Sequence, residues 1–325
     1  MIKFFRQSYA IQYVVIASLA IALWLPSFAS AKVMMGLEQP VTPLFNLING
    51  FLGFSPVAQI IFAFLLLVLE TLVFNAILVN NQIIGKVSTM GAFVFVLLMS
   101  LTRTQTQFYP FALSVIFILL AISALFDVYL EQKPELDLLK SGIFVALASM
   151  CYFPAFVLVL WLIAALPIAK KGTFRLGLIP LVGFFFVYFF YFVGTYLFGD
   201  FLPMIQAYRD WFVGFGFSVK GFNLQSLIVL AFLLIVSVVM LLSNSNLEKT
   251  LSVRVKMTMV MLLLLIALLM LFVGVNVMMN GLIFLVLSVV FANAFTYMSN
   301  TGWASLGLAL FLLLVFANHY FFKIL

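Results

Sequence analysis

Long apolar runs follow one another along almost the whole of this 325-residue chain, and charged residues are confined to the links between them. Hydrophobic residues make up 66% of the chain and charged residues only 8%, whereas about a quarter of a soluble domain is charged. A soluble protein of this length could not bury so much apolar surface, so lipid must solvate much of it. The sequence therefore predicts an all-α, polytopic transmembrane protein.

The lengths of the apolar runs give a count of spans, because a helix needs about 20 apolar residues to cross the hydrocarbon core of a bilayer. Seven runs have about that length, and the runs at 88–102 and 281–298 are shorter or more polar. Together they predict about nine full spans: 11–30, 56–79, 88–102, 110–131, 176–198, 223–243, 257–275, 281–298 and 302–322. The links are brief except for 31–55 and 199–222, so residues 1–325 form a single integral membrane domain.

Basic residues are divided unevenly between alternate links, which predicts the orientation of the chain. Eleven of the sixteen Lys and Arg residues fall in one alternate set: Lys3, Arg6, Lys86, Lys133, Lys140, Lys170, Lys171, Arg175, Lys249, Arg254 and Lys256. The other set holds Lys32, Arg103, Arg209, Lys220 and Lys323. Basic residues near span ends resist translocation, so the richer set and the N-terminus are expected to be cytoplasmic and the C-terminus exterior. The net charge of +7 follows from this pattern, and no basic stripe is long enough to bind nucleic acid.

The first apolar run has a second interpretation. Lys3 and Arg6 precede an apolar stretch that ends near Leu25, and 29–31 read Ala-Ser-Ala. Small residues at such positions are typical of a cleaved signal peptide, although the first span of a multispan protein has the same features.

The two long exterior links differ in character. Link 31–55 reads as a loop, whereas 200–217 has the spacing of an amphipathic helix with Gln206, Arg209 and Asp210 on one face. Trp211 lies among the apolar residues that cover most of the remaining surface. Such a helix is expected to lie in the membrane interface.

Residues 138–169 predict a broken helix pair. Lys140 and the cluster at 170–175 both belong to the cytoplasmic set, yet only about thirty residues separate them, and two full spans need about forty. Two short helices, at 138–150 and 155–169, are expected to meet near 152–154, where Pro154 disfavours a helical conformation for the residue before it. A pair of ordinary packing helices of irregular form is the alternative.

The middle of the chain resembles a known class of enzyme. LTRTQTQFYP (101–110) precedes a span ending LFDVY (125–129), and a short polar link leads to LKSGIFVALASMCYFP (139–154), an apolar run and the basic pair 170–171. This order is similar to the central part of GT-C-type glycosyltransferases, multispan enzymes that use polyprenyl-phosphate sugars. Over most of its length the chain also resembles a family of multispan inner-membrane proteins from Bacteroidota, which implies a bacterial inner membrane and a periplasmic exterior face.

The GT-C resemblance implies a site on that exterior face. Such enzymes place acidic residues in the first exterior loop, where Glu38 is the one candidate here. Its carboxylate is a candidate general base that deprotonates an acceptor hydroxyl. Arg103, Arg209 and Lys220 are candidates to hold the phosphate of the lipid carrier, because guanidinium and ammonium groups suit phosphate oxygens. The alternatives are a solvated loop charge for Glu38 and snorkelling toward lipid headgroups for the basic residues.

Two departures from the GT-C pattern keep a second hypothesis open. Glu38 has no acidic neighbour in its loop, and Gly142 is followed four residues later by Ala146 in place of a second glycine. A non-catalytic membrane subunit or scaffold of an envelope complex, bound to lipids and to other membrane subunits, therefore fits as well. A transporter is less favoured, because the chain has one broken pair and no second copy of it.

Few other residues suggest chemistry. His319 and Cys151 each occur alone, so we predict no metal site, no disulfide framework and no cofactor, and we expect His319 to be an interfacial residue. Glu70 lies well inside the second span, where a charged carboxylate is costly. It is either a proton or ion site or a neutral carboxyl bonded to Thr71, Asn75 or a neighbouring helix, and the second alternative is favoured.

Overall fold

The computed structural model describes residues 2–7, 9–29, 41–52, 55–84, 88–101, 105–129, 131–214, 250–272, 280–297 and 301–322. Within these ranges every regular element is a helix. The elements are α1 (Ile2–Phe5), α2 (Ala10–Ala29), α3 (Pro43–Leu52), α4 (Pro56–Asn80), α5 (Met90–Met99), α6 (Pro110–Val128), α7 (Glu135–Cys151), η1 (Phe153–Val157), α8 (Leu158–Ala165), α9 (Phe174–Phe198), α10 (Phe201–Gly214), α12 (Leu251–Phe272), α13 (Asn280–Tyr297), α14 (Thr301–Ala317) and η4 (Asn318–Phe322).

Among the helices of these described ranges, five are long and apolar enough to cross a membrane: α2, α4, α6, α9 and α12. Each coincides with a span predicted from hydropathy. The predicted span 223–243 lies outside the described residues, and α5 and α13 are shorter apolar helices. The all-helical structure and its five long apolar helices indicate a polytopic membrane protein, while the count of nine spans stays a prediction.

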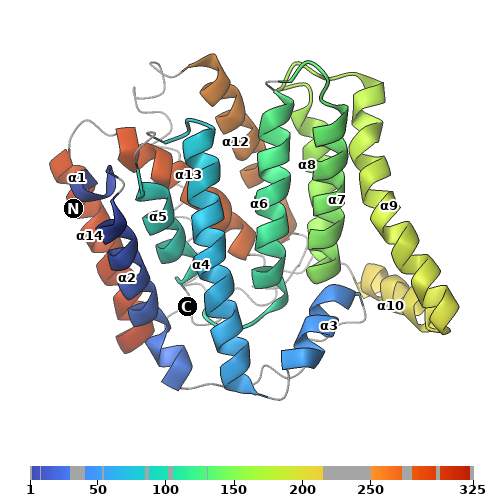
Figure 1. Cartoon of the computed structure of the whole chain (residues 1–325), viewed down its shortest axis with the longest axis horizontal. Coiled ribbons are helices and arrows are strands. Elements are labelled where there is room, and N and C mark those ends of the chain that lie inside the picture. Colours follow the sequence, from blue (N-terminus) through green and yellow to red (C-terminus); the bar gives the residue numbers. More distant parts are fainter. Residues whose placement is uncertain are drawn as a thin grey trace.

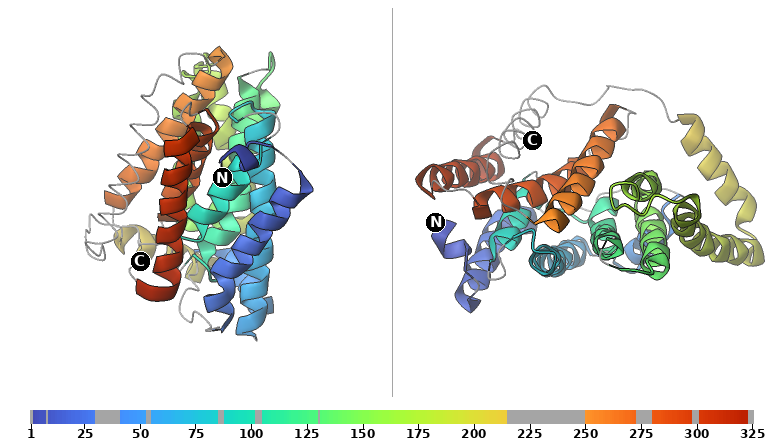
Figure 2. Two further views of the ribbon diagram at one scale, coloured as in Figure 1. Left: turned by 90° about the vertical axis from the view of Figure 1, so that its left-hand side faces the viewer. Right: turned by 90° about the horizontal axis from the view of Figure 1, so that it is seen from above.

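The helices form two layers. Helices α2, α4, α6, α7 and α9 stand side by side in one layer, with α12, α13 and α14 behind them, as the view from above shows (Figures 1 and 2). Helix α5 lies between the layers and packs on both α4 and α13. All ten of its residues are buried, which explains why this helix is apolar on every side.

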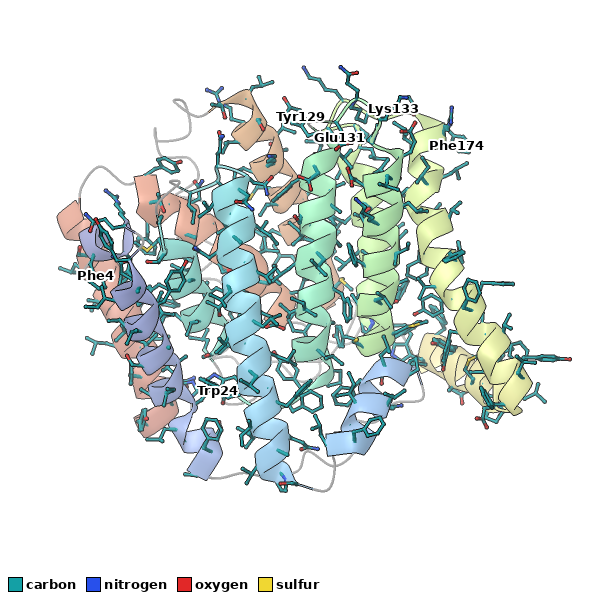
Figure 3. All side chains as sticks on the ribbon, in the orientation of Figure 1. Phe4, Trp24, Tyr129, Glu131, Lys133 and Phe174 are labelled. Carbon is teal, nitrogen blue, oxygen red and sulfur yellow. The ribbon has the colours of Figure 1, made fainter. Side chains whose placement is uncertain are left out.

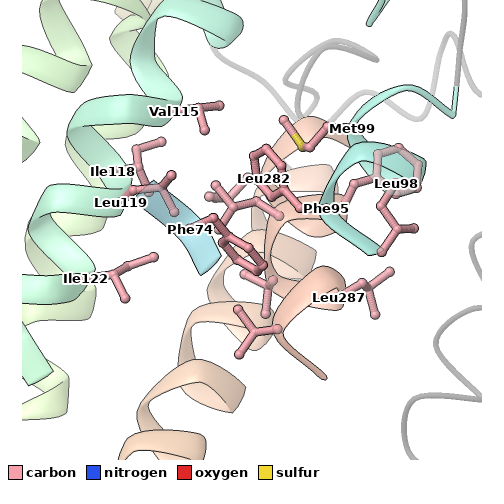
Figure 4. Close-up of a cluster of buried hydrophobic side chains, with 14 of the residues drawn as sticks. Phe74, Phe95, Leu98, Met99, Val115, Ile118, Leu119, Ile122, Leu282 and Leu287 are labelled. Carbon is pink, nitrogen blue, oxygen red and sulfur yellow. The ribbon is translucent and has the colours of Figure 1, made fainter. Parts of the chain in front are cut away.

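The core lies where α4, α5, α6 and α13 meet. Figure 4 shows Phe74 of α4 and Phe95 of α5 beside Ile118 of α6 and Leu282 of α13. The centroids of the two phenylalanine rings are 4.7 Å apart. These side chains are at most 2% exposed, so close van der Waals packing holds the elements together where lipid supplies no hydrophobic driving force.

Two glycines let the backbones of α7 and α9 approach closely. An added Cβ at Gly142 of α7 would lie 2.1 Å from the backbone oxygen of Pro180, and one at Gly183 of α9 would lie 2.5 Å from the backbone oxygen of Leu139. Because neither glycine has a side chain, the backbones of α7 and α9 come into direct contact. This packing gives Gly142 a structural role that does not depend on the GT-C resemblance.

The helix break predicted near 152–154 is confirmed. Helix α7 ends at Cys151, Tyr152 is extended with φ −140° and ψ 97°, and a 3-10 turn containing Pro154 leads into α8. Lys171, after α8, donates a hydrogen bond of 3.0 Å to the backbone oxygen of Glu131, before α7. The two helices therefore begin and end at the same end of the bundle, where Figure 3 labels Glu131.

The described basic residues of the richer set gather at this end, which we call the basic end. It carries α1, the link between α6 and α7, and the starts of α9 and α12 (Figures 1 and 3). The opposite end carries α3, the start of α4 and α10. The links that are rich in basic residues in the sequence thus lie at one end of the bundle in the structure.

Candidate functional site

Of the four residues predicted to form an exterior site, the structure describes one. Glu38, Arg103 and Lys220 lie outside the described residues. Arg209 is exposed on α10, at the end of the bundle opposite the basic end. The expected convergence of the four on one exterior cavity therefore stays a prediction.

Helix α10 is the amphipathic helix that the sequence predicted, and Gly199 determines where it lies. Helix α9 ends at Gly199 in the left-handed conformation, with φ 84°, which favours glycine because it has no Cβ. The chain then reverses, and Thr195 of α9 donates a hydrogen bond to the sulfur of Met204 at 3.5 Å. Leu202 and Val213 remain exposed, as expected for a helix that lies in a membrane interface.

Aromatic side chains hold α10 against the broken pair. The ring of Phe153 lies 5.0 Å from Tyr208, 4.7 Å from Trp211 and 5.7 Å from Phe212, centroid to centroid. Edge-to-face pairs of this kind add to the energy of burial. Burial raises the pKa of Tyr208, so its hydroxyl adds no negative charge here. Arg209, next in sequence, is therefore attached to an element anchored at the break.

The first long exterior link is not entirely a loop, which corrects one prediction. It contains α3, which packs on α7 and α4. Phe45 of α3 stacks on Phe108, with centroids 5.1 Å apart and an interplanar angle of 25°. Helix α3 has too few residues to span a membrane. Its apolar residues are interrupted by Asn46 and Asn49, so they form no long apolar run in the sequence.

Between α5 and α6, the described residues on either side of 102–104 are mostly buried, and side chains from distant elements bond to them. Trp24 of α2, labelled in Figure 3, donates its indole hydrogen to Ser100 Oγ at 3.0 Å. Asn318 donates to the backbone oxygen of Leu101 at 2.8 Å. Ser27 and Thr106 share a hydrogen bond of 2.6 Å. These hydrogen bonds help to fix the described residues on both sides of 102–104.

His319 takes part in this fixation, contrary to the prediction that it is interfacial. Its side chain is fully buried, and Nε2 lies 2.5 Å from the backbone oxygen of Ser100. A free backbone carbonyl beyond the end of α5 needs a partner in an apolar interior, and the imidazole supplies one. Sequence position near the end of the last span did not reveal this contact, because it joins residues 219 apart in the chain.

Glu70 is the titratable residue of α4, and its surroundings differ from those favoured by the sequence. The side chain is 2% exposed, and Oε1 has no hydrogen-bond partner in the described part of the chain. Thr71 donates instead to the backbone oxygen of Leu67 at 2.6 Å, and Asn75 bonds to Ser88, Ala92 and Tyr13. The prediction that Thr71 or Asn75 satisfies this carboxyl is therefore wrong.

A tyrosine that the sequence did not single out, Tyr109, lies beside Glu70, and a second, Tyr152, lies beyond it. The Tyr109 hydroxyl is within electrostatic range of Glu70 and of Tyr152. Phe111 links the two phenol rings, at 6.2 Å from Tyr109 and 5.6 Å from Tyr152 between centroids. Tyr109 directly precedes Pro110, the first residue of α6, and Tyr152 directly precedes the 3-10 turn that contains Pro154. This shared position next to a helix break was the signal available in the sequence.

Comparisons with family models, curated proteins and solved structures find no match for this chain. Its structure defines the class, a polytopic α-helical membrane protein with a broken helix pair and an amphipathic helix at one end. What the protein does within this class is inferred from its own residues.

Proposed function

We propose that the chain is a bacterial inner-membrane protein of GT-C-like arrangement that transfers a sugar from a polyprenyl-phosphate carrier at the periplasmic face. The observation that carries the proposal is the broken pair with α10 folded against it. Phe153 at the break contacts Tyr208 and Trp211, the neighbours of Arg209 on α10. An arginine at the membrane interface is suited to a lipid phosphate that enters from the bilayer.

The orientation follows from the basic end of the bundle. Basic residues near span ends are retained in the cytoplasm, so we place the basic end there, with the N-terminus cytoplasmic and the C-terminus periplasmic. Helix α10 and the link that contains Glu38 then face the periplasm. Polyprenyl-phosphate sugars are expected at that face, and both predicted parts of the site would meet their substrate there.

In the proposed reaction, Glu38 acts on the acceptor and the basic residues act on the leaving phosphate. Glu38 accepts the proton of an acceptor hydroxyl, whose oxygen bonds to the anomeric carbon of the sugar. The bond between that carbon and the phosphate oxygen breaks, and the polyprenyl phosphate leaves with the electron pair. Arg103, Arg209 and Lys220 stabilise the negative charge that develops on the leaving phosphate.

A transfer assay tests this proposal. Purified protein in lipid nanodiscs is supplied with a polyprenyl-phosphate sugar and a set of hydroxyl-bearing acceptors, and release of the lipid phosphate is measured. Glu38→Gln keeps the shape of the side chain and removes the base, so the rate should fall by about 10²- to 10⁴-fold. Binding of the lipid donor should persist. Asp200→Asn, at an exposed position at the same end of the bundle, is the matched control and should leave the rate unchanged.

The non-catalytic subunit is the competing function, and the same variants decide between the two. If Glu38→Gln fully complements a strain that lacks the gene, the enzyme proposal fails. A chain that binds the lipid donor but serves as a membrane subunit or scaffold would then remain. The enzyme and the non-catalytic subunit are both expected to bind the lipid donor. Only the enzyme is expected to transfer the sugar, so the transfer rate decides between them.

A further inference from the structure

The interior of the bundle contains a carboxyl group that the proposed sugar transfer does not use. Glu70 lies fourteen residues after the start of α4, about 20 Å along a helix that rises about 1.5 Å per residue. It is 2% exposed, and its Oε1 has no hydrogen-bond partner among the described residues. A charged carboxylate at such a position costs several kcal/mol unless donors surround it, so the neutral carboxyl is the favoured form.

The elements packed against α4 bring few charged or titratable groups to Glu70. Helices α3 and α5 contain none, and Asp127 of α6 lies at the basic end. Tyr13 is the titratable residue of α2, and its hydroxyl accepts a hydrogen bond of 3.2 Å from Asn75. Tyr109 lies close enough to Glu70 for a charge on the carboxylate to act on its hydroxyl.

Tyr109 can provide what a deprotonated carboxyl would need, a hydrogen-bond donor. The Tyr152 hydroxyl, which is buried and has no hydrogen-bond partner among the described residues, lies within electrostatic range of Tyr109. Tyr109 and Tyr152 both have extended backbone, at φ −145° and φ −140°.

We propose that Glu70, with Tyr109 beside it, forms a proton-binding site inside the bundle. The carboxyl holds the proton in the resting state, and the Tyr109 hydroxyl donates a hydrogen bond to the carboxylate when the proton leaves. The ligand is a proton and not a metal ion, since the described residues contain no group of three or more acidic, His or Cys ligands. This site does not depend on sugar transfer and would exist in a catalytic or a non-catalytic protein.

Labelling with dicyclohexylcarbodiimide tests the proposal directly. This apolar reagent adds to a protonated carboxyl: the acid proton passes to a carbodiimide nitrogen and the carboxylate oxygen bonds to the central carbon, after which the acyl group migrates to nitrogen as a stable acylurea. The full-length protein in nanodiscs is labelled over a range of pH, and the modified residue is mapped by mass spectrometry. We expect Glu70 to be labelled at neutral pH and labelling to fall as pH rises.

Variants of the tyrosines distinguish a proton site from a carboxyl that is merely buried. Tyr109→Phe removes a donor to the carboxylate, so the labelling midpoint should move up by about one pH unit, as expected for one hydrogen bond to a charged group. Tyr13→Phe is the matched control, because Tyr13 contacts the same helix through Asn75, and it should leave the midpoint unchanged. Equal midpoints in wild type and Tyr109→Phe would overturn the role of Tyr109.

Two further results would overturn the site itself. Suppression of labelling by Na⁺ at constant pH would mean that Glu70 holds a cation. If Glu70 is not labelled, infrared spectroscopy decides: absence of a protonated-carboxyl band at neutral pH would show that Glu70 is ionised. Labelling and infrared spectra are both measured on the wild-type protein, so a Glu70→Gln variant that fails to fold leaves the test intact.

Discussion

Individual polar residues determine how the helices of this bundle are joined. Asn75 of α4 accepts a hydrogen bond of 3.2 Å from the Ala92 amide of α5 and donates one to the Ser88 oxygen. At the basic end, Lys256 of α12 donates a hydrogen bond of 2.8 Å to Asn81 and is 3% exposed. In an apolar interior each such group needs a partner. These bonds therefore specify which helices are neighbours, whereas apolar packing alone would allow alternatives.

A prediction at the same scale concerns Arg103, the basic residue proposed to bind the phosphate of the lipid carrier. Arg103→Ala should weaken binding of a polyprenyl-phosphate sugar first and turnover as a consequence, because it removes a phosphate ligand and leaves the base in place. Arg103→Lys should restore part of the affinity, since an ammonium group cannot copy the two parallel hydrogen bonds of a guanidinium group. Titration of the fluorescent lipid donor into nanodisc-bound protein measures both effects. Equal affinity in wild type and Arg103→Ala would remove Arg103 from the proposed site.

At the scale of elements, the contact between α7 and α9 depends on the absence of side chains. Gly142→Ala would place a methyl group 2.1 Å from the Pro180 oxygen, which forces the two helices apart. Overpacking of this kind costs about 1–3 kcal/mol, so the variant should unfold at a lower temperature in detergent than the wild type. Separation of α9 would also disturb α10, which follows it directly.

Gly194→Ala is the matched control for this prediction. It lies on the same helix α9, but an added Cβ would meet no atom within 4 Å. Alanine has a higher helix propensity than glycine by about 1 kcal/mol, so this variant should be as stable as the wild type or slightly more stable. Thermal unfolding of the three proteins, followed by the fluorescence of a dye that reacts with buried Cys151, gives the comparison. Equal losses in both variants would contradict the explanation by close packing.

An element could be predicted from the sequence where residues close to it in the chain determine its bounds. The bounds of α4 and α9 follow from local features: Ser55 and Thr173 accept N-terminal hydrogen bonds, and Gly199 ends α9. The break near Pro154 was predictable for the same reason. Helix α3 and the contacts of His319 and Glu70 were not, because they depend on partners far away in the sequence. Apolar residues in all helices look alike in hydropathy, so the sequence does not specify their pairing.

At the scale of the whole molecule, the five long apolar helices of the described ranges differ widely in exposure. Helix α9 is the least buried of the five long apolar helices, and it presents Phe185, Phe186, Phe189 and Phe190 to the surroundings. Helix α6 is the most buried of the five. A soluble protein would not expose such a row of aromatic side chains, whereas lipid solvates it without cost. The exposed side of α9 is therefore suited to contact with lipid.

The proposed orientation of the two ends gives the last prediction. Single cysteines at Gln132 and Gly172 report on the basic end, and one at Asp210 reports on the opposite end; all three positions are exposed. In intact cells a membrane-impermeant maleimide should label Asp210→Cys and leave Gln132→Cys and Gly172→Cys unmodified until the membrane is opened. Native Cys151 is fully buried and should contribute no background. Labelling of Gln132→Cys and Gly172→Cys in intact cells, with Asp210→Cys protected, would invert the proposed topology. Glu38 and Arg209 would then face the cytoplasm, and sugar transfer at the periplasmic face would have to be abandoned.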